Sequence, residues 1–208
     1  MLWALFVFAL LGDTMSDPLA EAESRFQALT SYRVTVRATA GDGERHVLRY
    51  FYRKPGWMRM EFVQPHEGMV LIYDPGTRRV RVWPFGLNRL PRFSFAPDNP
   101  LVRGPRGHRV DRSDIGTLLA HLRAVVARGS LTTLGETQIA ARPAAGFEVR
   151  GEAHASRPEV QHYRIWLARD SLFPLRVEHF AADGRLLERV DMADVEIDVP
   201  LPERFFTP

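Results

Sequence analysis

The amino-acid sequence predicts a mainly β (α+β) protein, in which a strongly curved antiparallel sheet of about ten strands carries two amphipathic helices on its concave face. Short segments of alternating apolar and polar residues follow one another with only tight turns between them. Parallel strands would need crossovers of about a dozen residues, so the pairing should be antiparallel. A sheet of this size twists and curls, and two segments with helical apolar spacing are available to cover its hollow side.

The first helix is predicted over Pro18–Leu29. Asp17 supplies a capping carboxylate, and Pro18 suits the first helical position. Apolar residues then recur at helical spacing, namely Leu19, Ala22, Phe26 and Leu29. This pattern favours an amphipathic helix with one apolar face.

From Tyr32 the apolar period changes to two, which is typical of half-buried strands. Glycine and proline mark the turns between successive strands. The predicted strands of this half are Tyr32–Thr39, Glu44–Arg53, Trp57–Val63, Met69–Tyr73 and Arg78–Trp83.

One of these strands carries a stripe of methionine. Met58, Met60 and Phe62 should face the concave side, whereas Arg59 and Glu61 should face solvent, because successive side chains alternate. Methionine is unbranched and polarizable, so the stripe suits an irregular apolar guest as well as an ordinary core. Arginines facing away from the apolar stripes are expected on a solvated face or against anionic headgroups: Arg33, Arg37, Arg49, Arg59 and Arg81.

The next segment, Pro84–Arg112, breaks the strand pattern. It holds five prolines among arginines and aromatic residues. An irregular excursion of this length inside a compact domain is usually functional or mobile.

A second helix is predicted over Ile115–Ala127. Asp111 or Ser113 should cap its start, and Gly129 should end it. Its apolar residues share one face that should point into the hollow of the sheet: Ile115, Leu118, Leu119, Leu122, Val125 and Val126. The close spacing of Asp111 and Asp114 is better explained by capping than by paired catalytic carboxylates.

Strands resume after the second helix. Asp183–Gly184 is a strong hairpin signal between the last two of them. The predicted strands are Leu131–Ile139, Gly146–Glu152, His162–Ala168, Leu175–Phe180 and Leu186–Val199.

Composition limits the possible functions. The net charge is +3, from 28 basic and 25 acidic residues, and the basic residues are spread along the strands, so no nucleic-acid partner is indicated. The chain has no cysteine, which excludes disulfides, thiolate metal ligands, cysteine nucleophiles and a lipidated cysteine.

The N-terminus carries an apolar run from Leu2 to Leu11, too short to span a bilayer but typical of the apolar part of a signal peptide. Residues 1–15 are therefore predicted to be a signal peptide, and residues 16–208 a single exported, non-lipidated periplasmic domain. A buried N-terminal segment is the alternative.

No short motif for catalysis is present. The histidines form no metal-binding pair; His154 with Glu159 and His162 comes nearest, and no metal or other cofactor is expected. There is no G-x-S-x-G elbow and no glycine-rich phosphate loop. An enzyme is therefore not predicted.

Several stretches together resemble the LolA-like superfamily, which includes a periplasmic lipoprotein carrier, its outer-membrane acceptor and an envelope sensor protein. The stretch YRKPGWMRMEFVQP at Tyr52–Pro65, the turn Tyr73–Pro75 and the ending PLPERFFTP carry the resemblance. RGHRVDRSDIGTLLAHL at Arg106–Leu122 is similar to an uncharacterised branch related to outer-membrane lipoprotein sorting.

This resemblance implies a half-open β-barrel whose helices close an apolar cavity for lipid or lipoprotein acyl chains. The implied cavity lining is Met58, Met60, Phe62, Leu71, Tyr73, Val82, Leu118, Leu122, Val125 and Ile165. The carrier's lid-latching arginine corresponds here to Lys54, with Arg53 beside it, and lysine cannot offer the same planar fork.

Three functions follow as hypotheses. The first is a monomeric, non-catalytic lipid carrier that works with donor and acceptor proteins of the inner and outer membranes. The second is an envelope stress sensor or adaptor that binds protein partners and has a filled core. The third is a hydrolase of lipid-like substrates, which would require a perturbed His–Asp pair in a cleft.

Overall fold

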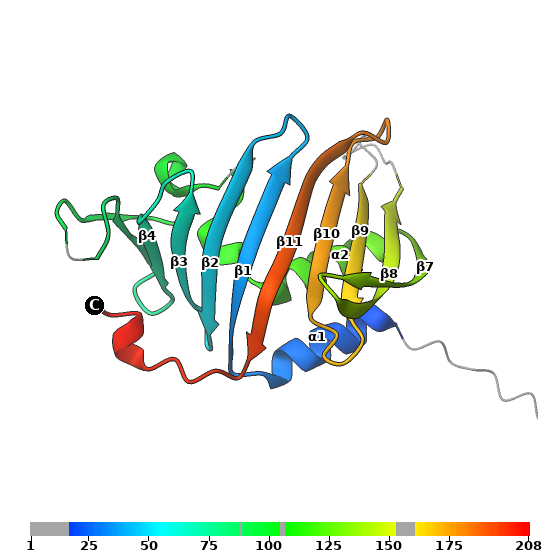
Figure 1. Ribbon diagram of the computed structural model, residues 1–208, viewed down its shortest axis with the longest axis horizontal. Helices are drawn as coiled ribbons and strands as arrows, with labels where there is room; N and C mark the ends of the chain where they lie inside the picture. The colour runs from blue at the N-terminus through cyan, green and yellow to red at the C-terminus, as the bar shows by residue number, and fades with distance from the viewer. Residues whose placement is uncertain (1–16, 88, 105–106, 153–160) are drawn as a thin grey trace, which may run out of the picture.

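The protein forms one eleven-stranded antiparallel sheet that is open at both edges, as the sequence predicted (Figure 1). The computed structural model describes residues 17–87, 89–104, 107–152 and 161–208. The strand order is β6-β5-β4-β3-β2-β1-β11-β10-β9-β8-β7. The chain adds strands outward from β1 to the edge strand β6 and then crosses to the opposite edge at β7. From there it adds strands inward until β11 pairs with β1 at the centre of the sheet. The predicted signal peptide over residues 1–15 lies outside the described residues.

The elements have the following bounds. The helices are α1 (Pro18–Ala28) and α2 (Ile115–Val126). The strands are β1 (Ser31–Ala40), β2 (Arg45–Arg53), β3 (Trp57–Gln64), β4 (Val70–Asp74), β5 (Arg79–Trp83), β6 (Phe93–Phe95), β7 (Gly129–Ile139), β8 (Arg142–Gly151), β9 (His162–Ala168), β10 (Pro174–Phe180) and β11 (Leu186–Ile197).

Both helices begin at aspartate caps. The Asp17 carboxylate accepts hydrogen bonds from the backbone of Leu19 at 3.0 Å and Ala20 at 3.2 Å, as predicted. The predicted cap of α2 was wrong: Asp114 is the cap and accepts from the Thr117 amide at 3.0 Å. Ser113, one residue before this cap, instead donates to the carbonyl of Val110.

Two boundaries differ from the sequence prediction because of turn geometry. Strand β8 begins at Arg142 and not at Gly146, since Ala140 and Ala141 form a tight turn with φ of 49° and 63°. Alanine rarely adopts this left-handed region, so the turn gave no sequence signal. Gly129 does not end α2; the helix stops at Val126, and Gly129 begins β7.

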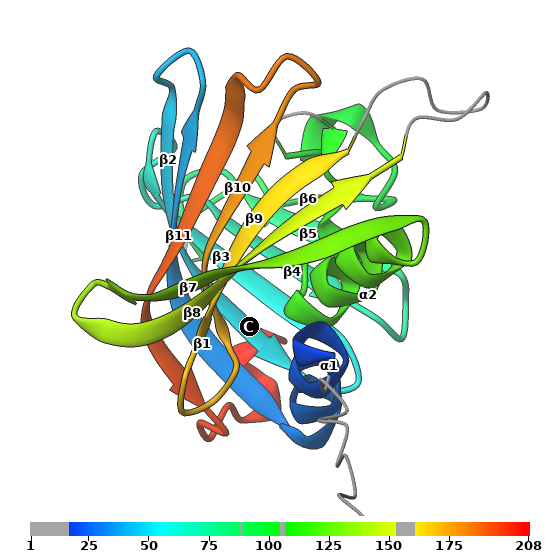
Figure 2. The ribbon, with the colours of Figure 1, turned by 90° about the vertical axis from the view of Figure 1, so that its right-hand side faces the viewer.

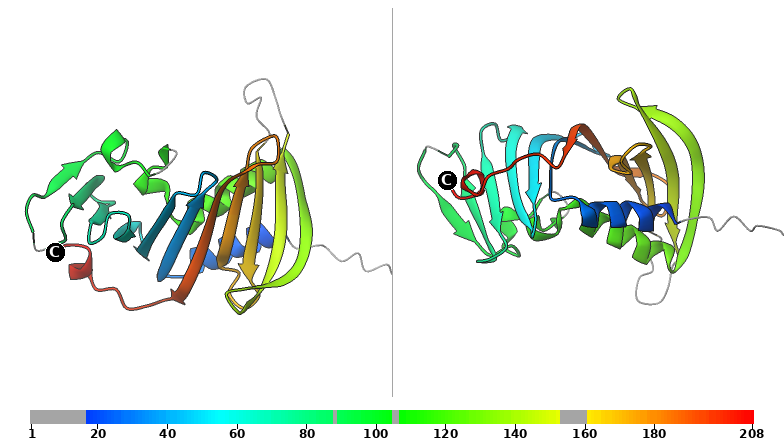
Figure 3. Two further views of the ribbon diagram at one scale, coloured as in Figure 1. Left: turned by 45° about the horizontal axis from the view of Figure 1, so that its top comes forward. Right: turned by 90° about the horizontal axis from the view of Figure 1, so that it is seen from below.

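The two helices lie side by side on the concave face (Figures 2 and 3). Helix α2 packs against β7, β8 and α1, which confirms the prediction that it covers the open side of the sheet. Gly116 permits the close approach of α1, because a Cβ atom there would lie 2.3 Å from Cε1 of Phe26. This contact fixes where the helices meet.

The opposite, convex face is covered at one end by the C-terminal segment (Figures 1 and 3). Phe206 is fully buried there with Val70, Ile72 and Trp83. A second, smaller apolar core therefore lies behind the sheet.

The prediction that Arg59 faces solvent was wrong. Its side chain donates to the Phe205 carbonyl at 2.6 Å, pairs with Glu61 at 2.5 Å and lies 4.0 Å from the Phe205 ring, which leaves the residue 8% exposed. Arg81 likewise donates to the Phe206 carbonyl at 2.8 Å. Strand parity was read correctly, but the C-terminal segment covers this face where water was expected.

Candidate functional site: the concave face and its helical cover

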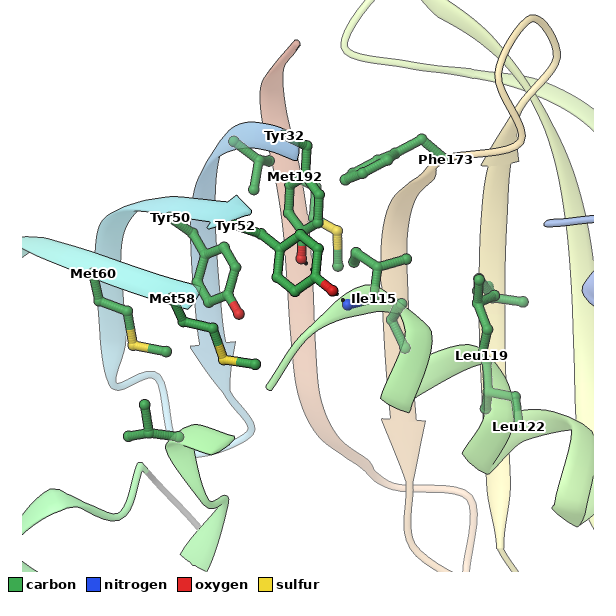
Figure 4. Packing of buried hydrophobic residues seen from close by; sticks show 14 of the residues in the cluster. Tyr32, Tyr50, Tyr52, Met58, Met60, Ile115, Leu119, Leu122, Phe173 and Met192 are labelled. Carbon is green, nitrogen blue, oxygen red and sulfur yellow. Dashed lines mark hydrogen bonds between the residues drawn. The ribbon is translucent and has the colours of Figure 1, made fainter. Parts of the chain in front are cut away.

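The concave face is built from rows of side chains that cross the strands in register. One row runs through Tyr32, Tyr52, Met58 and Tyr73, and the next runs through Val34, Tyr50, Met60, Leu71 and Val82. Antiparallel pairing places directly opposed residues about 5 Å apart, so each row is a continuous apolar band. Figure 4 shows Tyr32, Tyr50, Tyr52, Met58 and Met60 projecting from the strands on the side where Ile115 and the α2 helix lie.

All ten predicted lining residues lie in one hydrophobic cluster. Met58, Met60, Leu71, Val82, Leu122, Val125 and Ile165 are buried in it, and Phe62, Tyr73 and Leu118 pack against it half-buried. Residues that were predicted to line one cavity therefore lie together in the structure, although they come from β3, β4, β5, α2 and β9. Their contact with a ligand stays a prediction.

Aromatic rings fill the junction between this surface and α1. Tyr32 lies 5.1 Å from Tyr52 and 5.8 Å from Tyr50 in stacked arrangements, and it contacts the edge of Phe173 at 5.2 Å. Phe26 of α1 closes the group, with its centroid 5.5 Å from that of Tyr52. Such ring pairs give packing energy beyond the area that they bury.

The phenol groups of this cluster are neutral hydrogen-bonding groups. The hydroxyl of Tyr32 accepts from the Ile115 amide at 3.3 Å, and that of Tyr50 lies 3.3 Å from Oγ of Ser113. Burial raises the pKa of Tyr32 well above its ordinary value, raises the pKa of Tyr50, and raises the pKa of Tyr52 to about 12. These groups therefore present no ionised base to a substrate at neutral pH.

A pocket of about 250 Å³ opens where α1, the start of α2, the β9–β10 turn and the end of β11 meet. Its apolar wall comprises Ala22, Phe26, Leu29, Ile115, Leu119, Leu172 and Phe173, with Arg25, Ser171 and Asp198 also in its lining. None of the ten predicted lining residues borders it. Sequence reasoning missed this site because its wall comes from four separated segments, and no local pattern marks their meeting.

The polar groups around this pocket are paired within the protein. Arg25 donates to the Asp170 carbonyl at 2.9 Å. Asp198 accepts from the amide and hydroxyl of Thr30 at 2.6 and 2.9 Å, and these hydrogen bonds lower its pKa. The wall is therefore left to apolar contacts.

Two cations hold α1 in place. The Lys54 ammonium donates to the carbonyl of Gln27 in the last turn of α1. Arg123 of α2 pairs with Glu23 of α1 and lies 3.7 Å from Asp17. Arg53, predicted as a second latch, instead donates to the Leu201 carbonyl at 3.1 Å and so holds the C-terminal segment.

The candidate metal ligands do not assemble among the described residues, in which no group of three or more metal-binding side chains occurs. His162 lies in the sheet and contacts Glu148 at 3.0 Å. His154 and Glu159 fall outside the described residues. In the part of the chain that the structure describes, no helix is both long and apolar enough to cross a membrane.

An open, curved antiparallel sheet with two helices on its concave face is the architecture that the sequence resemblance implied, so the predicted fold is confirmed. A scan against protein-family models finds no match, and a comparison with curated proteins finds none either.

Solved structures give the same result for the fold. An uncharacterised conserved protein from Thermus thermophilus is similar with a TM-score of 0.54 and 15% identity, over 91% of this chain and 92% of that chain. In the Pseudomonas aeruginosa MucA/MucB complex the TM-score is 0.54 at 16% identity, over 88% of this chain and 59% of that chain. The Mycobacterium tuberculosis lipoprotein LppX gives 0.51 at 13% identity, over 89% and 97%. At these identities the similarity concerns the fold alone.

Proposed function

We propose that this protein is a non-catalytic periplasmic binding protein or carrier for lipids or lipoprotein acyl chains. The observation that supports the proposal most directly is that the pocket wall is continuous with the apolar cluster on the concave face. The wall of the 250 Å³ pocket includes Ile115, Leu119 and Phe173, which belong to the same cluster as the methionine rows of the sheet. An apolar chain that enters the pocket would therefore meet an uninterrupted apolar surface.

The chemistry of this surface favours a long apolar ligand. The hydroxyls of Tyr32 and Tyr50 already have partners, and Met58 and Met60 can repack around an irregular guest. Burial of one methylene is worth about 0.8 kcal/mol, so ten would gain about 8 kcal/mol before the costs of ordering. Micromolar affinity requires roughly this amount, so the ligand must reach beyond the pocket into the cluster.

Movement of α1 is the proposed route to this deeper surface. Lys54 and Arg123 hold the helix through contacts at the protein surface, and exposed charged contacts typically contribute up to about 1 kcal/mol each. The sheet, by contrast, is held by continuous backbone pairing. Leu19 and Ala22 of the helix are also buried in the main cluster, but displacement of the helix breaks no strand pairing, and we therefore propose it as the way to enlarge the interior.

A protein-binding adaptor is the second candidate. It is favoured by the similarity to MucB, whose structure was solved in complex with MucA. In this case the interior would remain a filled core, and binding would use an outer surface. The two proposals differ in whether the purified protein takes up an apolar probe.

Native mass spectrometry of the purified protein, followed by titration with a fluorescent fatty acid, tests the proposal. We expect co-purifying lipid, or saturable uptake of the probe at micromolar concentration with a blue-shifted emission. Protein that carries no lipid and takes up no probe would contradict the carrier function and favour the adaptor.

A further inference from the structure

The irregular segment between β5 and β6, together with the first residue of β6, presents apolar side chains to solvent. Phe85 is 60% exposed, Leu90 is 86% exposed and Phe93 is 44% exposed. These three account for half of the six large apolar side chains that are exposed among the described residues. Large apolar side chains gathered on one protruding segment indicate a binding surface more strongly than single exposed residues do.

Two arginines stand among these side chains, and no other described residue pairs with their charged groups. Arg89 and Arg92 are exposed, and neither guanidinium makes a hydrogen bond or ion pair with the described residues. The surrounding stretch 84–112 contains six arginines and only two aspartates, while the whole chain has a net charge of +3. The rest of the chain is thus almost neutral, and its excess positive charge is concentrated here.

Contacts with the rest of the protein anchor the segment at both ends. Leu87 packs against the convex-face cluster of Phe206 and Trp83. At the other end, Phe93 pairs with Val82 across β5 and β6, and its ring lies 6.0 Å from that of Phe95. The segment lies at the β6 end of the sheet, away from β7 (Figures 1 and 3).

We propose that these five side chains form a docking surface for an anionic lipid bilayer, with Arg89 and Arg92 binding headgroup phosphates while Phe85, Leu90 and Phe93 enter the interfacial region. Arginine suits phosphate because its planar guanidinium can donate two hydrogen bonds to it. Exposed aromatic and leucine side chains can enter the headgroup region singly, with no need for a shape-complementary groove. A protruding tip of this composition therefore fits a membrane better than a protein partner.

The docking surface is also continuous with the proposed ligand surface. Phe93 lies in the same cross-strand row as Val82, Leu71 and Met60, and Phe95 packs against the main cluster. Docking would bring this end of the concave face against the lipid. In this respect the inference rests on the proposed function, because a bilayer is a source or destination of its acyl ligand.

Vesicle sedimentation tests the docking surface. The probes are vesicles of phosphatidylcholine alone and of phosphatidylglycerol and phosphatidylcholine in equal parts. We expect the full-length protein to bind the anionic vesicles and Arg89→Gln/Arg92→Gln to bind them roughly thirtyfold more weakly, since each basic residue near the surface contributes about fivefold. Leu90→Asp should lower binding at least tenfold, because it removes the most exposed apolar group and adds a charge.

Matched controls come from other parts of the sheet. Arg37→Gln/Arg49→Gln removes two exposed arginines elsewhere, and Leu134→Asp changes a residue that is 44% exposed on β7, at the opposite edge. Both should bind anionic vesicles like the wild type. Failure of the wild type to bind anionic vesicles, equal binding to both vesicle types, or an equal loss in the control variants would each overturn the proposal.

The two proposals fail separately. Uptake of a soluble fluorescent fatty acid reports the interior, and it should be unchanged in Arg89→Gln/Arg92→Gln. Loss of probe uptake in these variants would contradict a role confined to membrane docking.

Discussion

Replacement of Leu119 by tryptophan should block the pocket while leaving the fold intact. Leu119 is fully buried in the cluster and also borders the pocket, so the larger ring has space to enter. The indole would occupy space that about three methylenes of a ligand could fill, which removes about 2.4 kcal/mol of binding free energy, or roughly fiftyfold in affinity. The assay is titration with a fluorescent fatty acid, together with urea unfolding.

Leu122→Trp measures what a larger ring on this face of α2 costs in stability. Leu122 lies one turn further along the same face of α2 and is equally buried, but it does not border the pocket. Tryptophan there must overpack the core, at a cost of about 1–3 kcal/mol in unfolding free energy. If Leu119→Trp binds the probe as tightly as the wild type does, the pocket is not the ligand's route into the protein.

Three further predictions concern stability and opening. Phe206→Ala should lower the unfolding free energy by about 3–5 kcal/mol, because this fully buried ring is the centre of the convex-face core. Calorimetry should show no comparable effect for the control Thr207→Ala, which changes an exposed residue. Lys54→Ala should speed amide hydrogen exchange in the last turn of α1 about fivefold, because it removes the hydrogen bond to the Gln27 carbonyl. Lys54→Arg should largely restore the protection. Unchanged exchange in Lys54→Ala would show that Lys54 does not latch the helix. The pKa of Glu148 is lowered to about 2, chiefly by its hydrogen bond from Arg150. Its contribution to stability should therefore be complete above pH 4.5 and disappear as the pH falls toward 2. The difference in unfolding free energy between wild type and Glu148→Gln, measured by urea unfolding, should shrink over that range.

The strands of the sheet could be predicted because their signals are local. The alternation through Met58, Met60 and Phe62 gave the correct concave face, and the turn at Asp183–Gly184 has the positive φ of 85° that glycine permits. Strand β6 was missed, since three residues are too few to show a period. Local pattern therefore determined most of the pairing but not the edge of the sheet.

The candidate site was only partly predictable, because it depends on contacts between distant segments. Parity assigned Arg59 to the polar face, but nothing near it in the sequence indicates that Phe205 would cover that face. In the same way, the pocket joins Phe26, Ile115 and Phe173, which lie far apart along the chain. Helical spacing identified the apolar face of each helix but not the place where the helices leave a gap.

The two faces of the sheet together determine how the interior can open. On the convex side, Arg53, Arg59 and Arg81 bind carbonyls of the C-terminal segment and so tie β2, β3 and β5 to one strap. These strands carry the methionine and tyrosine rows on their other side, so the strap stiffens the wall against which a ligand would lie. Helix α1 has no such strap among the described residues; Leu19 and Ala22 bury its apolar face in the main cluster, and charged contacts hold it at the surface. Because backbone pairing and the C-terminal strap both hold the wall, a ligand should enter by displacing the helix and not by spreading the strands.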